Sequence, residues 1–432
     1  MYTVARLMVG ALMLALSGRA VAAPVYIHAG RIIAIPGKTV RGPSTIIVDG
    51  ELITAVRDGY VAPPAGASVI DLKDKTVLPG LIDSHVHLAS DRGGEAGLLS
   101  FVREEPQMNS LEAQMNGMKT LRAGFTTVRN LGDDGATLAL RGAIKRDWVQ
   151  GPRIVDAASS ISTTGGHMDG RGGLNDDLVA HLPAPENLCD GVDSCRKVVR
   201  RQIDRGADVI KFATTGGVNS GTGLATRMVE SEARALVETA HAYGRKVAVH
   251  AHGAEGIKLA LRAGADSIEH GTVMDDDILR LMKKQGTYYV PTLSTVNGYL
   301  ERLAANPNAY APDVKKQIDW RIGITGQSLL KAVPAGVKIA FGTDAGVSKH
   351  GRNADEFELM VKYGMTPVET IKAATVNAAD LLGLAAEIGT IEVGKSADII
   401  AVAGDPLTDV TTLKRVTFVM ARGEVVPPAA TR

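Results

Sequence analysis

Hydrophobic residues follow two different patterns along this chain, and the change between them divides the sequence. Between residues 25 and 76, apolar residues form short β-branched runs, and Asp49-Gly50 between two of these runs is typical of a hairpin turn. From residue 77 onward, short apolar runs alternate with stretches whose apolar residues recur every three or four positions. Runs of the first kind return near the C-terminus. This order predicts an α/β fold flanked by β structure from both chain ends.

The central part of the chain predicts eight strands in alternation with helices. The expected strands are Val77–His87, Thr126–Arg129, Arg153–Ala157, Asp208–Phe212, Lys246–His250, Ser267–His270, Tyr288–Leu293 and Val337–Asp344. The clearest helical patterns cover Glu112–Arg122, Glu230–Tyr243, Ala254–Arg262, Asp275–Lys284 and Val314–Lys331. Eight such units over residues 77–385 favour a (β/α)8 barrel of the TIM type. A doubly wound sheet is the alternative, but no Gly-x-Gly-x-x-Gly turn opens its first helix.

The two flanking segments predict a second, smaller domain built from both chain ends. We expect residues 23–76 and 386–432 to form a small β-sandwich. Its N-terminal strands are predicted at Val25–Ile27, Arg31–Ala34, Thr45–Val48, Glu51–Val56 and Ser68–Leu72. Its C-terminal strands are predicted at Gly389–Glu392, Ala397–Val402 and Val416–Met420.

Residues 1–22 have the features of a secretory signal peptide. A short basic start is followed by the apolar run Leu7–Leu16 and by Ala20-Val21-Ala22, a small-x-small cleavage pattern. A membrane anchor would need about 20 apolar residues, and Arg19 interrupts the run. We therefore expect cleavage near Ala22 and a secreted protein, which in a Gram-negative host is periplasmic.

Composition and net charge exclude few further classes of protein. The chain has 432 residues, 45% of them hydrophobic, and a net charge of +1. This balance gives no reason to expect a nucleic-acid or membrane-surface partner, and it is compatible with a homo-oligomer. The only cysteines, Cys189 and Cys195, lie six positions apart. In an oxidising compartment such a pair predicts a disulfide, placed just before a helix beginning near Arg196; a two-cysteine metal site is the alternative.

Polar residues at the ends of the predicted strands indicate a metal site. In a barrel of this type the active site lies at the carboxyl ends of the strands. Side chains two positions apart on a strand share a face, so His85 and His87 point the same way. Other metal-capable or unusual residues at strand ends are Lys211, His250, His270 and Asp344.

This set is too large for one tetrahedral ion with an open position. Imidazole and carboxylate ligands suit zinc and similar divalent ions, so the set predicts two ions about 3.5–4 Å apart that share a hydroxide. A charged ammonium group would repel both ions. Lys211 must therefore lose its proton or be modified into an anionic ligand.

Nearly the whole chain after the signal peptide resembles the amidohydrolase superfamily of metal-dependent hydrolases. The segments that carry this resemblance are Val77–His87, Lys211, His250, His270, Gly342-Thr343-Asp344 and Gly389–Asp398. The chain is similar in particular to the branch with Xaa-Pro dipeptidases, arginine/lysine carboxypeptidases and ochratoxin-hydrolysing amidohydrolases. The segments that point to this branch are Thr163–His167, Thr215–Ser220 and Val249–Gly253.

The resemblance implies a ligand assignment. It implies that Lys211 is carboxylated and bridges two zinc ions. It also implies that His85, His87 and Asp344 hold one ion, and that His250 and His270 hold the other. His250 and His252 share a strand face, so either can be the ligand; the twenty-residue step from His250 to His270 matches the family better and would leave His252 nearer the substrate.

The expected activity is hydrolysis of an amide bond in a small substrate with a free carboxylate. Asp344 would accept a proton from the hydroxide and pass it to the leaving nitrogen. Candidate substrate contacts in loops after the strands are Arg92, His167, Ser220, Arg227, His252 and Arg352.

Three functions remain open at the level of the sequence. The first is an exported amidohydrolase that cleaves dipeptides or N-acyl amino acids, such as a Xaa-Pro dipeptidase, a carboxypeptidase or an ochratoxin A hydrolase. The second is a cyclic-amide hydrolase like the imidazolonepropionases, because one barrel can serve several chemistries. The third is a barrel without catalysis that acts as a binding protein, against which the intact ligand set argues.

Overall fold

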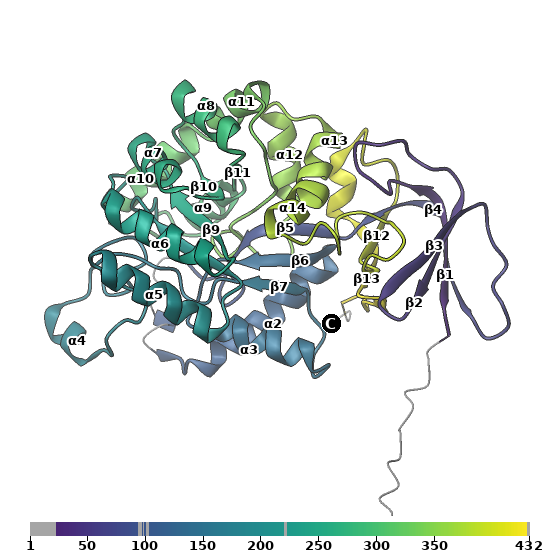
Figure 1. Ribbon diagram of the computed structural model, residues 1–432, viewed down its shortest axis with the longest axis horizontal. Helices are drawn as coiled ribbons and strands as arrows, with labels where there is room; N and C mark the ends of the chain where they lie inside the picture. Colours follow the sequence, from purple (N-terminus) through teal and green to yellow (C-terminus); the bar gives the residue numbers. More distant parts are fainter. Residues whose placement is uncertain (1–22, 94–96, 98, 101–102, 220–222, 430–432) are drawn as a thin grey trace, which may run out of the picture.

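The computed structural model describes residues 23–93, 97, 99–100, 103–219 and 223–429. The predicted signal peptide, with its cleavage position, therefore lies outside the described residues, as does Ser220. Figure 1 shows a large part made of strands and surrounding helices, beside a smaller part made mainly of strands. No helix within the described ranges is long and apolar enough to cross a membrane.

The smaller part is one mixed sheet to which both chain ends contribute. Its seven strands run in the order β14-β13-β12-β4-β1-β2-β3. Their bounds are β1 Val25–Ile32, β2 Ser44–Asp49, β3 Leu52–Asp58, β4 Ser68–Pro79, β12 Ile399–Val402, β13 Val416–Ala421 and β14 Glu424–Val425. β1 and β4 pair in parallel, and the other neighbours are antiparallel. A separate apolar core contains residues from both halves of this sheet, including Ile27, Ile46, Ile399 and Met420.

Two details of this sheet differ from the prediction. The two strands expected at Val25–Ile27 and Arg31–Ala34 are the single strand β1. The strand expected at Gly389–Glu392 is absent from the structure. There the backbone N–H of Ile391 donates to the carbonyl of Ala34, while the side chains of Thr390 and Glu392 hydrogen-bond to each other, so no ladder forms.

The larger part contains two parallel sheets. One has the order β5-β6-β7 and the other the order β11-β10-β9-β8. The strands are β5 Leu81–Val86, β6 Phe125–Asn130, β7 Arg153–Asp156, β8 Val209–Ala213, β9 Lys246–Ala251, β10 Ser267–His270 and β11 Tyr288–Val290. All neighbouring pairs in both sheets are parallel, as the alternation of strands and helices predicts.

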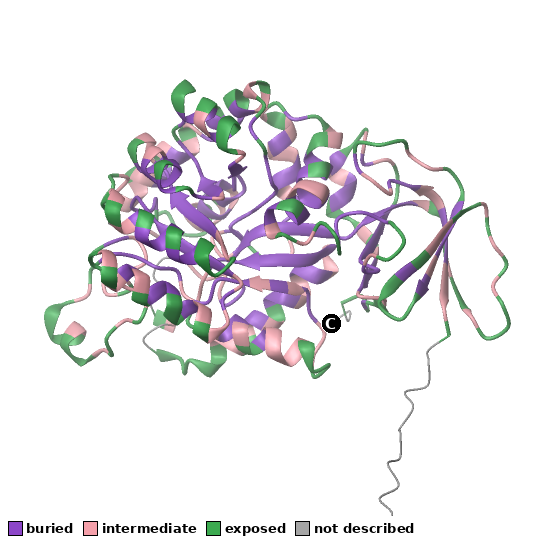
Figure 2. Ribbon diagram, in the orientation of Figure 1, coloured by how far each residue is buried: buried purple, intermediate pink, exposed green. Residues whose placement is uncertain are grey.

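Helices surround these strands in Figure 1, and Figure 2 shows that the strands are buried while the helices expose their outer faces. The helices are α2 Gln107–Arg122, α3 Ala136–Lys145, α4 Asp176–His181, α5 Val192–Arg205, α6 Glu230–Ala242, α7 Ala254–Ala263, α8 Asp276–Gln285, α9 Thr295–Ala305, α10 Pro312–Gly323, α11 Gln327–Ala335, α12 Asp355–Lys362, α13 Pro367–Lys372 and α14 Ala378–Leu382. Four of the five predicted helical segments each correspond to one of these helices, and the fifth, Val314–Lys331, covers parts of two. This burial pattern follows from apolar stripes at helical spacing.

Hydrogen bonds connect the two parallel sheets on both sides. On one side, Ile161 bridges to Phe212 and the N–H of Asp208 donates to the carbonyl of Asp156. On the other side, the segment 337–345 lies between β11 and β5, with bridges from Ile339 to Tyr289 and from Ala345 to Val86. The segment thus occupies the place of the predicted eighth strand but forms only isolated bridges. Its end is not extended, because Asp344 has a left-handed backbone with φ of 56°.

Two predicted elements are each divided in the structure. The strand expected at Val77–His87 is split at Gly80 into β4, in the mixed sheet, and β5, in the parallel sheet. A Cβ at Gly80 would lie 2.1 Å from Oγ1 of Thr126, so only glycine allows this close crossing. The helix expected at Val314–Lys331 is split into α10 and α11 at Gly326, which has φ of 79°.

Candidate metal centre

His85, His87 and Asp344 form one group of possible metal ligands. His85 lies near the end of β5, His87 follows that strand, and Asp344 lies in the connecting segment beside it. The Nε2 atoms of His85 and His87 lie 3.5 Å and 3.4 Å from Oδ1 of Asp344. The left-handed backbone of Asp344 turns its carboxylate out of the strand direction at this point. Each residue therefore offers one ligand atom within 4.8 Å of the other two.

His250, His252 and His270 form a second group. His250 lies in β9, His252 follows it, and His270 ends β10. Their rings are close, with centroid distances of 4.5 Å between His250 and His270 and 4.8 Å between His252 and His270. The Nδ1 atoms of His252 and His270 each lie 2.7 Å from a threonine hydroxyl, that of Thr272 and Thr292 respectively. Their Nε2 atoms are therefore left as ligand atoms, and the structure places both His250 and His252 in the group.

Lys211 connects the two groups. It lies in the middle of β8, is 1% exposed, and its Nζ lies 3.5 Å from Nε2 of His85. Burial is the main cause that lowers the pKa of Lys211, to about 8. The negative charges of Glu269 and Asp344 oppose this shift, and the positive charge of Arg129 adds to it. A buried amine among five imidazoles and a carboxylate is thus easier to deprotonate than a lysine in water.

Four histidines of the two groups, His85, His250, His252 and His270, favour the neutral state that binds metal. Burial and then the charge of Lys211 lower the pKa of His85 to about 4. Burial lowers the pKa of His250, His252 and His270 well below the usual value as well. Burial alone would raise the pKa of Asp344, but His85 and His87 hold it at about 2. The site therefore presents neutral imidazoles and an ionised carboxylate, the donor set that divalent ions need.

A fully buried ion pair fixes the orientation of His85. Oε2 of Glu269 lies 2.8 Å from Nδ1 of His85, and Oε1 accepts a hydrogen bond from Nη2 of Arg129 at 2.8 Å. Ser267 donates to the same oxygen at 2.5 Å, and Arg129 also donates to the carbonyl of Ser84 at 2.6 Å. Glu269 and Arg129 were not predicted from the sequence. Each is a charged residue inside a predicted strand, as Lys211 is, and this position could have identified them.

Asp83 links the strand that carries His85 to the segment that carries Asp344. Its carboxylate accepts hydrogen bonds from Oγ1 of Thr343 at 2.6 Å, from Nδ2 of Asn353 at 2.8 Å and from the N–H of His85 at 3.1 Å. Burial raises the pKa of Asp83 to about 6. These bonds hold the segment that carries Asp344 against β5, so the two parts of the ligand group cannot move independently.

Both ligand groups and Lys211 line one cavity of about 260 Å³. Other residues in its wall are Ser90, His167, Asn219, Thr295, Tyr299, Arg321 and Val347. The structure therefore brings together all six predicted metal ligands and two predicted substrate contacts, His167 and His252. Arg321 and Tyr299 were not identified from the sequence.

Arg92 was predicted to contact substrate, but it is not among the described residues that line the cavity. Its guanidinium forms ion pairs with Glu104 and Glu112 instead. Two carboxylates further along the chain therefore neutralise the charge of this arginine. Arg352 is similarly paired with Asp355 and Glu301.

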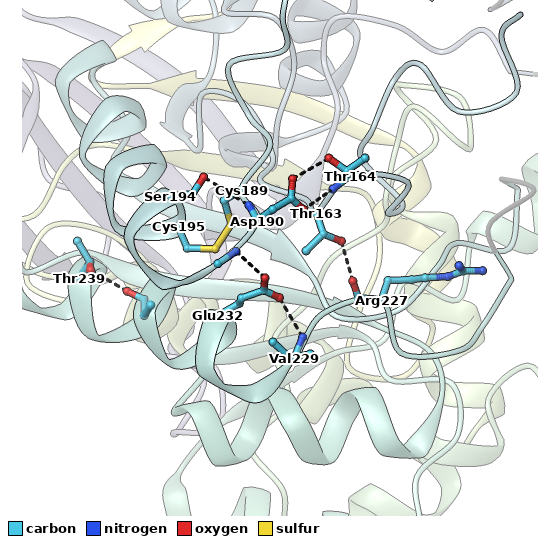
Figure 3. The surroundings of a disulfide bond; sticks show 12 residues. Thr163, Thr164, Cys189, Asp190, Ser194, Cys195, Arg227, Val229, Glu232 and Thr239 are labelled. Carbon is cyan, nitrogen blue, oxygen red and sulfur yellow. Dashed lines mark hydrogen bonds between the residues drawn. A yellow bond between two sulfur atoms is a disulfide. The ribbon is translucent and has the colours of Figure 1, made fainter. Parts of the chain in front are cut away.

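A disulfide braces the loop that carries His167. Cys189 and Cys195 are bonded, with Cα atoms 4.7 Å apart. Asp190, between them, accepts hydrogen bonds from the N–H and hydroxyl of Thr164 at 3.1 Å and 2.7 Å (Figure 3). The helix after the bridge differs from the prediction, since α5 begins at Val192 and so contains Cys195. The first turn of α5, Val192-Asp193-Ser194, has no apolar repeat that would have indicated this earlier start.

Residues 76–426 match the amidohydrolase family. The chain belongs to the amidohydrolase family. It is 31% identical over 418 residues to an ochratoxinase of Aspergillus niger, covering 92% of this chain and 86% of the relative. It also resembles the solved structure of a Xaa-Pro dipeptidase with bound methionine in the active site, with 39% identity, a TM-score of 0.88, and 93% and 99% of the two chains covered.

A second solved relative is a prolidase complexed with N-methylphosphonate-L-proline. It is 31% identical, has a TM-score of 0.84, and the match covers 93% of this chain and 99% of that one. The family and these relatives, taken with the site, show that this member of the amidohydrolase family is a hydrolase that acts on amide bonds.

Proposed function

We propose that this protein is an exported amidohydrolase with two metal ions that releases an amino acid from dipeptides or N-acyl amino acids. One observation carries the proposal. Two groups of candidate ligands, all but His87 buried, line the same cavity as a buried lysine. This arrangement fits two ions better than one, because each group supplies three donor atoms of its own.

The residues present fit divalent ions, and zinc suits their imidazole and carboxylate donors. His85, His87 and Asp344 would hold one ion, and His250 and His270 the other. Lys211, carboxylated on Nζ, would bridge them as an anion in place of an ammonium group that would repel both. When bound, the two ions would supply a water of lowered pKa and polarise the amide carbonyl.

The chain itself supplies proton transfer and orientation. Asp344 is ionised and faces the cavity, so it can accept a proton from the attacking water and pass it to the leaving nitrogen. Glu269 holds the ring of His85 through Nδ1, which fixes the orientation of a ligand. His167, 4.2 Å from the ring of His250, lies where it can contact the substrate.

The fold and the location belong to the same proposal. The two parallel sheets and the segment 337–345 would together form a (β/α)8 barrel, and the mixed sheet would fold over its own apolar core as a sandwich. Residues 1–22 would direct export to the periplasm.

The proposal is tested by amino-acid release from the zinc-loaded mature protein. The panel contains Xaa-Pro, Xaa-Arg and Xaa-Lys dipeptides, N-acetyl amino acids and ochratoxin A, with a cyclic amide as comparison. We expect release from a subset of the linear amides. Hydrolysis of the cyclic amide alone, with two ions bound, would overturn the proposal in favour of the imidazolonepropionase-like alternative.

A further inference from the structure

Arg321 brings a positive charge into the wall of the metal-site cavity. It lies in α10, is 3% exposed, and lines the cavity together with Tyr299 and Thr295 of α9. Arginine stays protonated in proteins, so this is a permanent charge close to the ligand groups.

No carboxylate within the described ranges neutralises this charge at ion-pair distance. The one hydrogen bond that the Arg321 side chain makes there runs from Nη1 to Oγ1 of Thr325 at 3.1 Å. The other arginine buried near the site, Arg129, is paired with Glu269. A buried guanidinium with five donors is costly unless an anion accepts from it. Arg321 therefore has donors to spare and a charge that needs a partner.

Arg321 shares its cavity with the residues around the expected reaction centre. The same wall contains Tyr299, His252 and Asp344. A substrate that fills this cavity therefore meets the guanidinium of Arg321 as well as the candidate metal ligands.

We propose that Arg321 binds the α-carboxylate of the substrate and so restricts the enzyme to amides of C-terminal amino acids. In such a substrate only Cα separates the carboxylate carbon from the scissile nitrogen, so these two atoms lie about 2.5 Å apart. A cavity of about 260 Å³ can contain both groups. A guanidinium fork matches a carboxylate with two parallel hydrogen bonds, which favours an acid over its neutral amide.

This inference rests on the proposed function, and it adds that the substrate must carry a free α-carboxylate. None of the three arginines predicted from the sequence, Arg92, Arg227 and Arg352, is among the described residues that line the cavity. Arg92 and Arg352 are already paired with acidic side chains. Arg321 differs from both because it is buried, lines the cavity and lacks an acidic partner within the described residues.

The test compares each N-acetyl amino acid with its C-terminal amide. On the unaltered enzyme we expect kcat/KM for the acid to exceed that for the amide by on the order of 10- to 100-fold, the worth of a charge-assisted hydrogen bond. Arg321→Met should remove this difference by raising KM for the acid, with the amide unchanged. Arg321→Lys should restore part of it. Arg280→Met, a control at an exposed arginine of α8 that is paired with Asp277, should behave as the unaltered enzyme.

Equal activity of the unaltered enzyme on acid and amide would overturn the inference. So would an equal loss on both substrates in Arg321→Met at unchanged metal content and melting temperature.

A binding measurement separates this inference from the proposed function. N-acetyl amino acids should raise the melting temperature of the metal-free protein but not that of Arg321→Met. If this stabilisation is seen without any hydrolysis by the zinc-loaded protein, the proposed function fails and carboxylate binding stands. If hydrolysis is seen but neither binding nor turnover depends on Arg321, the inference fails and the function stands.

Discussion

Oε2 of Glu269 lies 2.8 Å from Nδ1 of His85, and both side chains are almost completely buried. The second oxygen of this carboxylate is paired with Arg129, and burial opposed by Arg129 and His85 leaves the pKa of Glu269 at about 2. An ionised carboxylate at Nδ1 fixes the tautomer of His85 with its lone pair on Nε2, toward Asp344 and Lys211. The candidate metal centre is therefore supported by residues within the strands as well as by residues of the loops.

Glu269→Gln should weaken metal binding by about 10- to 100-fold, because the amide no longer raises the basicity of His85. Metal affinity is measured by competition with a chelator of known affinity. The single variant also leaves Arg129 buried without its partner, which costs about 3–5 kcal/mol of stability.

The double variant Arg129→Met/Glu269→Gln separates these two effects. It removes the unpaired charge, so it should recover stability against unfolding while metal affinity stays low. A double variant with the original metal affinity would show that Glu269 acts only by stabilising the fold.

Asp344→Asn should keep most of the bound metal and lose turnover by about 10²- to 10⁴-fold, the usual contribution of a general acid–base group. The amide can still offer an oxygen ligand, but it cannot accept and return a proton. Metal content and product release are measured on the same sample. If turnover persists while both ions are bound, Asp344 does not transfer the proton.

Lys211 should carry a carbamate in the metal-loaded protein. Burial lowers the pKa of its amine, which favours reaction of the neutral form with carbon dioxide. Reconstitution with zinc and 13C-labelled bicarbonate should give a carbamate carbon signal by NMR, and Lys211→Arg should lack it. Full reconstitution with two ions and no such signal would contradict a carboxylated lysine.

Removal of the disulfide should act locally on the His167 loop. A bridge between residues six positions apart stabilises by about 2 kcal/mol on the chain-entropy account. Cys189→Ser/Cys195→Ser should lower the unfolding free energy by this amount and speed hydrogen exchange around residues 159–169. A reducing agent should reproduce the effect in the original protein and change nothing in the double variant; unchanged exchange in this loop would argue against a bracing role.

The site was predictable from the sequence where the strand pattern alone decides which way a side chain points. His85 and His87 share a strand face because strands alternate with a period of two, and the other ligands follow short apolar runs. The resemblance to a known family then ordered them into a ligand set. The structure places all six in the wall of one cavity.

The remaining residues depend on contacts that a sequence does not display. In the sequence Arg321 is an ordinary charged residue of a helix, and only the three-dimensional structure shows that it lines the cavity. Arg92 was a candidate because it lies in a loop after a strand, but two glutamates further along the chain pair with it. Propensity and spacing carry no information about such long-range partners.

The most direct test of the account is a zinc titration of the metal-free mature protein, followed by amino-acid release from the best substrate of the panel. If each group of ligands holds one ion, activity should reach its full value only when two zinc ions are bound per chain. His270→Ala should bind one ion fewer and stay inactive. Full activity with one zinc ion bound per chain would contradict the central claim. So would the absence of activity when two zinc ions are bound.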